Sequence, residues 1–235
     1  MEERKGLQNM IKTAFVPIIV YYFAHQISAM FLLTLVSRFF PKHAGNIGSF
    51  SVMLAKMLAM ILAGALVSNY YWKEQKIRYP NTEKAEVKIQ FNYMKKCIIA
   101  IAGAVFSLGF NYLFARIGLT ESSANYSQVA MEQFSYGLLP ALFFYGVVSP
   151  VIEEMVFRGI VYSSLKRNLN MQMAMLGSAL LFGAMHGNLV QMLYGTIMGI
   201  VMAILYEKYD KLLAPILFHG AANMAIYICV YFAGT

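Results

Sequence analysis

The chain has 235 residues, of which 59% are hydrophobic and only 13% are charged, and its formal net charge is +8. A typical soluble domain carries about 25% charged residues, so this composition excludes a soluble globular protein and indicates a lipid bilayer. The basic residues flank apolar segments and form no stripe with interleaved aromatic residues, which argues against a nucleic-acid partner. We therefore expect membrane lipid around most of the chain.

Apolar stretches near the roughly 20 residues that a membrane-spanning helix needs account for most of the sequence. They are 13–37, 47–72, 97–115, 136 into the 150s, 171–185, 189–206 and 212–232. The sequence therefore predicts an all-α, polytopic membrane protein with about seven transmembrane helices in one bundle. We expect a single transmembrane domain over 1–235, with variable amino-terminal helices in 1–135 and, in 136–232, core helices that carry the polar motifs.

The distribution of charge predicts the orientation of these helices. The first stretch is too long for a signal-peptide core and has no small-residue cleavage site after it, so we expect a retained anchor. Arg4, Lys5 and Lys12 precede it and more basic residues fill 73–96, whereas 118–133 has two glutamates and no Lys or Arg. The amino terminus is therefore expected in the cytoplasm and the carboxyl terminus outside, in a multi-pass protein of the cell membrane. Alternating charge over 83–88 predicts a short surface helix.

Ionisable side chains inside apolar sequence are the most informative feature of the chain. Each costs roughly 2.5 to 3.5 kcal/mol at bilayer depth, so several kept together indicate pairing or function. Glu154 and Arg158 have the spacing and order of a helical ion pair. Glu153 lies about 100° around the helix from Glu154, so the two carboxylates point in different directions. We assign Glu153 to chemistry as the unpaired proton acceptor and Glu154 to support; a solvated helix end at the headgroups is the alternative.

Further polar residues follow in later stretches. Pro140 and Pro150 interrupt the fourth stretch, and Pro150 predicts a broken helix just before the glutamates. His186 lies near the end of the fifth stretch, where a histidine that merely packs against its neighbours is the alternative reading. His219 and Asn223 are four residues apart and share one helix face, and such a pair can stabilise an oxyanion or make a helix-to-helix hydrogen bond.

The ordered motifs Glu-Glu-x-x-x-Arg, Phe-x-x-x-His and His-x-x-x-Asn, each on its own membrane helix, resemble the signature of the CPBP family. This family, also called the Abi family, contains type II CAAX prenyl endopeptidases and bacteriocin-processing or self-immunity proteins. The resemblance covers 149–223, and every signature position matches.

The resemblance implies an intramembrane endopeptidase with a cavity open toward the cytoplasm. Its substrate would be a membrane-associated peptide or protein, lipidated or not, as in CAAX-type, bacteriocin or signalling-peptide processing. Carried over by residue, the roles are water activation by Glu153 and His186, oxyanion binding by His219 and Asn223, and support of the Glu153 helix by Glu154 and Arg158. The alternative is a non-enzymatic membrane immunity or partner-binding protein.

Zinc is the cofactor that has to be weighed, because glutamate and histidine are zinc ligands. The sequence has no His-Glu-x-x-His pair on one helix, and Asn is a poor zinc ligand but a good oxyanion donor. We therefore expect a glutamate-type hydrolase without metal or other cofactor, with a zinc metalloprotease mechanism as the alternative.

Other polar and small residues in the apolar stretches have simpler explanations. His25, Lys56 and Asn111 are expected to pack, to snorkel or to make interhelical hydrogen bonds. Gly195 and Gly199 form a close-packing face that is either internal or part of a dimer, which leaves the oligomeric state open.

Overall fold

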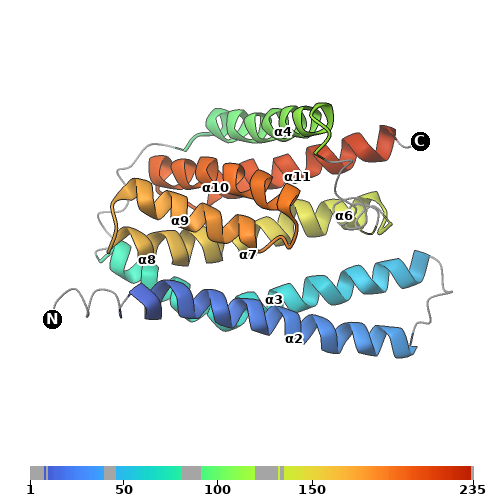
Figure 1. Ribbon diagram of the computed structural model, residues 1–235, viewed down its shortest axis with the longest axis horizontal. Helices are drawn as coiled ribbons and strands as arrows, with labels where there is room; N and C mark the ends of the chain where they lie inside the picture. Colours follow the sequence, from blue (N-terminus) through green and yellow to red (C-terminus); the bar gives the residue numbers. More distant parts are fainter. Residues whose placement is uncertain are drawn as a thin grey trace.

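The computed structural model describes residues 10–39, 46–80, 91–119 and 135–233, together with residues 8 and 132. The regular structure in these residues is helical, and most of the helices run along one common axis (Figure 1). In chain order the elements are η1 (Ile11–Phe15), α2 (Val16–Phe39), α3 (Asn46–Arg78), α4 (Tyr93–Arg116), α6 (Leu138–Phe143), η3 (Phe144–Val148), α7 (Ser149–Glu154), η4 (Met155–Tyr162), α8 (Ser163–Lys166), α9 (Met171–Ala184), α10 (Leu189–Tyr209) and α11 (Leu213–Ala233), where η marks a π-helix.

Within the described residues, six helical stretches are long and apolar enough to cross a membrane, and α9 is a shorter apolar helix. Large apolar side chains face outward along them; Phe23, Ile27 and Phe31 on α2 each have more than half of their surface exposed. Such a surface is unfavourable in water and favourable in lipid. The predicted all-α polytopic membrane bundle is confirmed.

The helix over 138–166, which runs from α6 to α8, lies at the centre of the bundle. Helices α2 and α3 pack against each other as one pair, α9 and α10 as another, and α4 packs on α11. Segment η4 contacts members of the first two pairs, and α7 contacts α3 and α11. All apolar side chains of η4 after Met155 are buried. The polar motif of Glu153, Glu154 and Arg158 therefore sits on the most enclosed helix.

The prediction of a broken helix at Pro150 is wrong. The helix is continuous from Leu138 to Lys166, and Pro150 lies in the first turn of α7, directly after the π-helix η3. In a π-helix each N–H donates to the carbonyl five residues earlier, so the turn is wider than in an α-helix. The change of register before Pro150 accommodates the missing N–H, and the chain does not have to break.

Helix α9 is too short to be the full span that the sequence suggested for 171–185. Its 14 residues extend about 21 Å at 1.5 Å per residue, against a hydrocarbon thickness of about 30 Å. The chain then turns through Gly187, whose φ is +74°, and α10 starts at Leu189 with Asn188 as its N-cap. This early turn places His186 among the other helices.

Glycine contacts show that the small-residue face of α10 is internal. A Cβ atom at Gly199 would lie 2.8 Å from Ala179 Cα on α9, and one at Gly195 would lie 3.4 Å from the ring of His186. These glycines therefore let α9 and α10 approach closely, and the alternative of a dimer face is not needed to explain them.

The remaining polar residues of the apolar stretches have nearby partners, and those of Asn111 and His25 lie on their own helices. The ammonium group of Lys56 lies 2.5 Å from Glu132, the amide of Asn111 donates to Ser107 O at 3.0 Å, and His25 stacks on Tyr21. The predicted surface helix over 83–88 lies outside the described residues.

Candidate active site

The three motifs meet at one cavity of about 190 Å³, which we call the polar cavity. Glu153 reaches it from α7, His186 from the turn after α9, and His219 and Asn223 from α11. The aromatic rings of Tyr145, Phe182, Tyr194 and Tyr227 form much of its remaining wall. Side chains that are 70 residues apart in sequence are thus brought together by helix packing.

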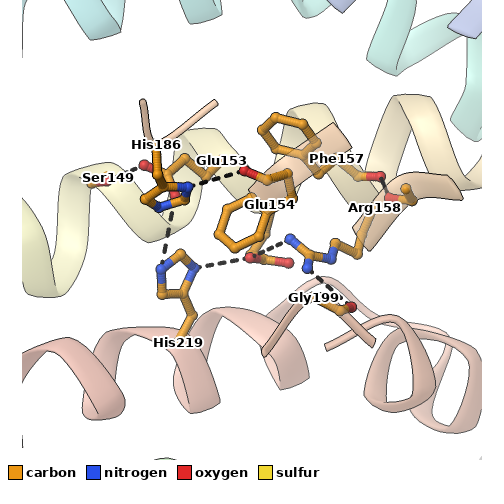
Figure 2. A network of polar contacts seen from close by, with 10 residues as sticks. Ser149, Glu153, Glu154, Phe157, Arg158, His186, Gly199 and His219 are labelled. Atoms are coloured by element: carbon orange, nitrogen blue, oxygen red, sulfur yellow. Dashed lines mark hydrogen bonds and ion pairs between the residues drawn. The ribbon is translucent and has the colours of Figure 1, made fainter. Parts of the chain in front are cut away.

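Glu153 is the carboxylate that faces this cavity. Its Oε1 accepts a hydrogen bond of 2.5 Å from Ser149 Oγ, one helical turn earlier (Figure 2). Its Oε2 lies 3.8 Å from His219 Nε2, which is beyond hydrogen-bond distance. One carboxylate oxygen is therefore fixed by a neutral donor, while the other faces the histidine.

Glu154 and Arg158 lie behind the cavity and are completely buried. Arg158 Nη1 donates to Glu154 Oε1 at 2.8 Å, which is the predicted ion pair. Arg158 Nη2 donates to Gly199 O at 3.1 Å, and the guanidinium carbon lies 4.7 Å from the ring centroid of Phe182. Two charges away from solvent are tolerated only when they are paired in this way. The hydrogen bond from Arg158 to Gly199 also connects this pair, on α7 and η4, to α10.

His219 lies between the two glutamates. Its Nδ1 is 2.9 Å from Glu154 Oε1, and Figure 2 shows the ring reaching from α11 toward both carboxylates. An ionised carboxylate only accepts hydrogen bonds, so Nδ1 carries the hydrogen and Nε2 is directed at the side of Glu153. Glu154 therefore orients the histidine as well as the arginine.

His186, in the turn after α9, is oriented by the backbone of that helix. Its Nδ1 lies 3.0 Å from Phe182 O, and because a carbonyl only accepts, the hydrogen is on Nδ1. In the neutral ring Nε2 then carries a lone pair that can take a proton. The ring of Phe182 packs edge-to-face on both His186 and His219, with centroid distances of 5.0 and 5.6 Å.

Asn223 contacts the helix that carries the glutamates. Its Nδ2 donates to Tyr145 O at 2.8 Å, the carbonyl five residues before Pro150. In the π-helical register Pro150 would supply the N–H for this carbonyl, and proline has none. An amide NH₂ group has two hydrogens, so a second donor remains for the cavity.

Two side-chain hydroxyls donate hydrogen bonds to carbonyl groups of η4. Ser178 donates to Phe157 O at 2.8 Å, and Ser163 donates to Arg158 O at 3.0 Å. These bonds satisfy buried carbonyl groups of η4.

Ser149 and Gln191 are among the residues of the cavity that the sequence did not single out. Ser149 lies four residues before Glu153, so the spacing that revealed the Glu154–Arg158 pair would have found it too. Gln191 lies three residues after Asn188; its N–H donates to Asn188 Oδ1 at 2.9 Å, and its own Oε1 accepts from Asn188 Nδ2 at 2.6 Å. This is the spacing of a capping box, and it leaves the Gln191 amide with its NH₂ donors.

The residues that the structure describes contain no group of three or more His, Cys, Asp and Glu side chains arranged to hold a metal ion. Around the polar cavity, His219 Nδ1 and one oxygen of Glu154 are taken up by each other, and Asn223 is a weak ligand.

A protein-family model matches the segment that carries the three motifs. Residues 135–225 match the family model described as Type II CAAX prenyl endopeptidase Rce1-like. A stretch of 82 residues is 34% identical to a Bacillus subtilis (strain 168) protein named "Putative membrane peptidase YdiL"; it covers 35% of this chain and 34% of YdiL. No solved structure matches the chain.

The chain thus spans about a third of the curated relative that it matches. The family-model match over 135–225 includes the helices that carry all three motifs. The apolar helices and the Bacillus relative agree with a multi-pass protein of a bacterial plasma membrane. The match over 135–225 to the Rce1-like, type II CAAX prenyl endopeptidase model therefore supports the resemblance to the CPBP family that the motifs carry.

Proposed function

We propose that this protein is an intramembrane endopeptidase that hydrolyses a peptide bond in a membrane-associated peptide or protein. The observation that carries the proposal is the convergence of Glu153, His186, His219 and Asn223 on one cavity inside a membrane bundle. The family match and the name of the Bacillus relative support a peptidase role. Placing four polar side chains in lipid-embedded sequence is costly, so a chemical role accounts for their presence.

In the proposed first step, a water molecule in the polar cavity loses a proton to Glu153 or to Nε2 of His186. Both groups line the cavity, and the Nδ1 hydrogen bond of His186 directs its other nitrogen away from Phe182 O. The water oxygen then bonds to the carbonyl carbon of the substrate, and the carbonyl π electrons move to its oxygen.

In the second step, the negative oxygen of the tetrahedral intermediate is stabilised by hydrogen bonds. The second N–H of the Asn223 amide and the Nε2–H of protonated His219 are the proposed donors. The C–N bond then breaks, and the proton taken from water passes to the leaving nitrogen. Atoms and charge balance without any further reactant.

The buried Glu154–Arg158 pair has a positioning role in this proposal. Glu154 Oε1 receives both Arg158 and His219, so it fixes the ring that faces Glu153. With His219 protonated and both glutamates ionised, the group formed by these residues and Arg158 has no net charge. Neutrality lowers the cost of keeping it away from water.

The proposed substrate class is a peptide or membrane protein segment that reaches the cavity from the lipid or the membrane surface. The aromatic wall of Tyr145, Phe182, Tyr194 and Tyr227 suits an apolar side chain or a lipid-modified residue beside the scissile bond.

The test is cleavage of a peptide panel by purified protein in lipid nanodiscs. The panel contains prenylated CAAX peptides, the same peptides without lipid, and bacteriocin-type leader peptides. Wild type is compared with Glu153→Gln, and Glu132→Gln serves as the matched control because Glu132 pairs with Lys56 away from the cavity. We expect cleavage by wild type and control, and a loss of about 100- to 10,000-fold in Glu153→Gln.

Equal cleavage by Glu153→Gln would remove Glu153 as the base. Absence of cleavage by wild type over the whole panel, together with binding of one of its peptides, would favour the non-enzymatic immunity or partner-binding protein instead. Each reaction is repeated with a strong chelator. Activity that survives chelation supports the metal-independent mechanism, whereas loss that zinc restores would replace it with a metalloprotease mechanism.

A further inference from the structure

Ser149 is a buried serine whose hydroxyl is directed at the proposed catalytic carboxylate. Only 6% of its surface is exposed, it lines the polar cavity, and its Oγ donates to Glu153 Oε1 at 2.5 Å. Figure 2 shows the two side chains next to each other on α7. A short hydrogen bond to an ionised group is among the stronger polar contacts in a protein, and it limits the rotamers that Glu153 can adopt.

A helical serine usually uses its hydroxyl in another way. In a helix the hydroxyl commonly donates to the carbonyl four residues earlier, which for Ser149 is Tyr145 O. Here Tyr145 O receives Asn223 Nδ2 at 2.8 Å. The usual acceptor of Ser149 is thus engaged by a side chain from α11, and the serine hydroxyl is directed forward to Glu153.

The backbone around Ser149 explains why Asn223 can reach this carbonyl. Segment η3 ends at Val148, and Pro150 supplies no N–H for the carbonyls of the preceding turn. Helix α11 comes so close there that a Cβ atom at Gly220 would lie 2.4 Å from Gly146 O. This close approach places Asn223, one turn after His219, beside Tyr145 O.

From these contacts we propose that Ser149 is a positioning residue, which holds the Glu153 carboxylate in the polar cavity, and that Asn223 supports it by occupying Tyr145 O. The inference rests on the proposed function, because the role of Ser149 in turnover requires Glu153 to act there. Asn223 then has two roles, with one amide hydrogen on Tyr145 O and the other free for the oxyanion.

Three serine variants test the first part. Ser149→Ala removes the hydroxyl, and Ser149→Thr keeps it. Ser163→Ala is the control: it removes a similarly buried hydroxyl on the same long helix, and this hydroxyl donates to Arg158 O. We expect Ser149→Ala to lower kcat about 10- to 100-fold with little change in KM, because the base is misplaced while substrate binding is retained. Ser149→Thr and Ser163→Ala should keep kcat near wild type. Equal kcat in Ser149→Ala and Ser163→Ala would overturn the inference.

A spectroscopic measurement separates this inference from the proposed function. The infrared difference spectrum between wild type and Glu153→Gln isolates the carboxylate band of Glu153, and this band depends on its hydrogen bonding whether or not the protein cleaves anything. We expect the same band to shift in a Ser149→Ala background and to stay in place with Ser149→Thr. If wild type cleaves no peptide and the Glu153 band still shifts in the Ser149→Ala background, the peptidase proposal is refuted and the contact between Ser149 and Glu153 stands. An unshifted band would overturn the role of Ser149.

The same infrared measurement tests the role proposed for Asn223. In Asn223→Ala, the hydrogen bond from the Asn223 amide to Tyr145 O is lost, and Ser149 can turn back toward that carbonyl. We therefore expect the Glu153 band to shift in Asn223→Ala in the same direction as in Ser149→Ala. If the band stays at its wild-type position, Asn223 does not control Ser149, and this part of the inference is wrong.

Discussion

His219 donates a hydrogen bond to Glu154, with 2.9 Å between Nδ1 and Oε1, and not to the adjacent Glu153, from which its Nε2 is 3.8 Å away. Glu154, which the sequence assigned to supporting the Glu153 helix, therefore also orients the ring of His219. Because Glu154 Oε1 also accepts from Arg158, one buried oxygen connects α7, η4 and α11. Changes at Glu154 should affect both stability and activity.

Replacing Glu154 with Gln should destabilise the protein strongly. The substitution leaves the Arg158 guanidinium, which has no exposed surface, without a counter-charge. Breaking one partner of a buried pair costs about 3 to 5 kcal/mol. The measurement is the midpoint of thermal unfolding in detergent. Glu207→Gln is the matched control, because its partner Lys166 is partly exposed and such pairs contribute about 0 to 1 kcal/mol. Equal midpoints in the two variants would contradict the prediction.

Replacing His186 with Asn should abolish cleavage while the fold is retained. The Asn amide can still donate to Phe182 O, as Nδ1 does now, but the nitrogen directed away from that carbonyl is lost. We expect a loss of about 100- to 10,000-fold in kcat/KM. In a His186→Ala variant, imidazole added to the buffer should restore part of the activity. Near-normal cleavage by His186→Asn would show that Nε2 has no part in the reaction.

Gly220→Ala should be destabilising because α11 lies directly against η3. A Cβ atom at Gly220 would be 2.4 Å from Gly146 O, a backbone atom that cannot move independently. Overpacking of this kind costs about 1 to 3 kcal/mol, and it displaces the neighbouring His219. The control is Gly109→Ala on α4, where no atom lies within 4 Å and removal of a helical glycine should stabilise slightly. The comparison uses unfolding midpoints and cleavage rates; a Gly220→Ala protein as stable as Gly109→Ala would refute this account of the packing.

Gln191→Ala should weaken substrate binding more than it slows turnover. The Gln191 carbonyl is held by Asn188, which leaves its NH₂ group as a donor in the cavity wall. Losing one hydrogen bond to a substrate carbonyl is expected to raise KM about 10-fold with a smaller change in kcat. Gln172→Ala, at an exposed position at the start of α9, should leave both constants unchanged. An unaltered KM in Gln191→Ala would exclude this contact.

Local features of the site were predictable because they depend on helical spacing. The Glu154–Arg158 ion pair follows from an i to i+4 interval, and the opposite directions of Glu153 and Glu154 follow from 100° per residue. The membrane class follows from composition, since apolar sequence of this length has few other stable environments. The same reasoning failed at Pro150, because spacing does not reveal a π-helical register.

Contacts between distant segments required the tertiary structure. His219 is 65 residues from Glu154, and Asn223 is 78 residues from Tyr145, so neither partner can be found from intervals within one helix. The short α9, the turn after it and the close approach at Gly220 decide which polar groups meet. The sequence by itself determined that this is a polytopic helical membrane protein with three polar motifs. A continuous apolar stretch of about 20 residues has the length of a membrane-spanning helix, and charged side chains within it are costly and therefore rare. Only the packing of those helices decided which carboxylate faces the cavity and which one orients His219, because hydrogen bonds depend on positions within a few tenths of an ångström.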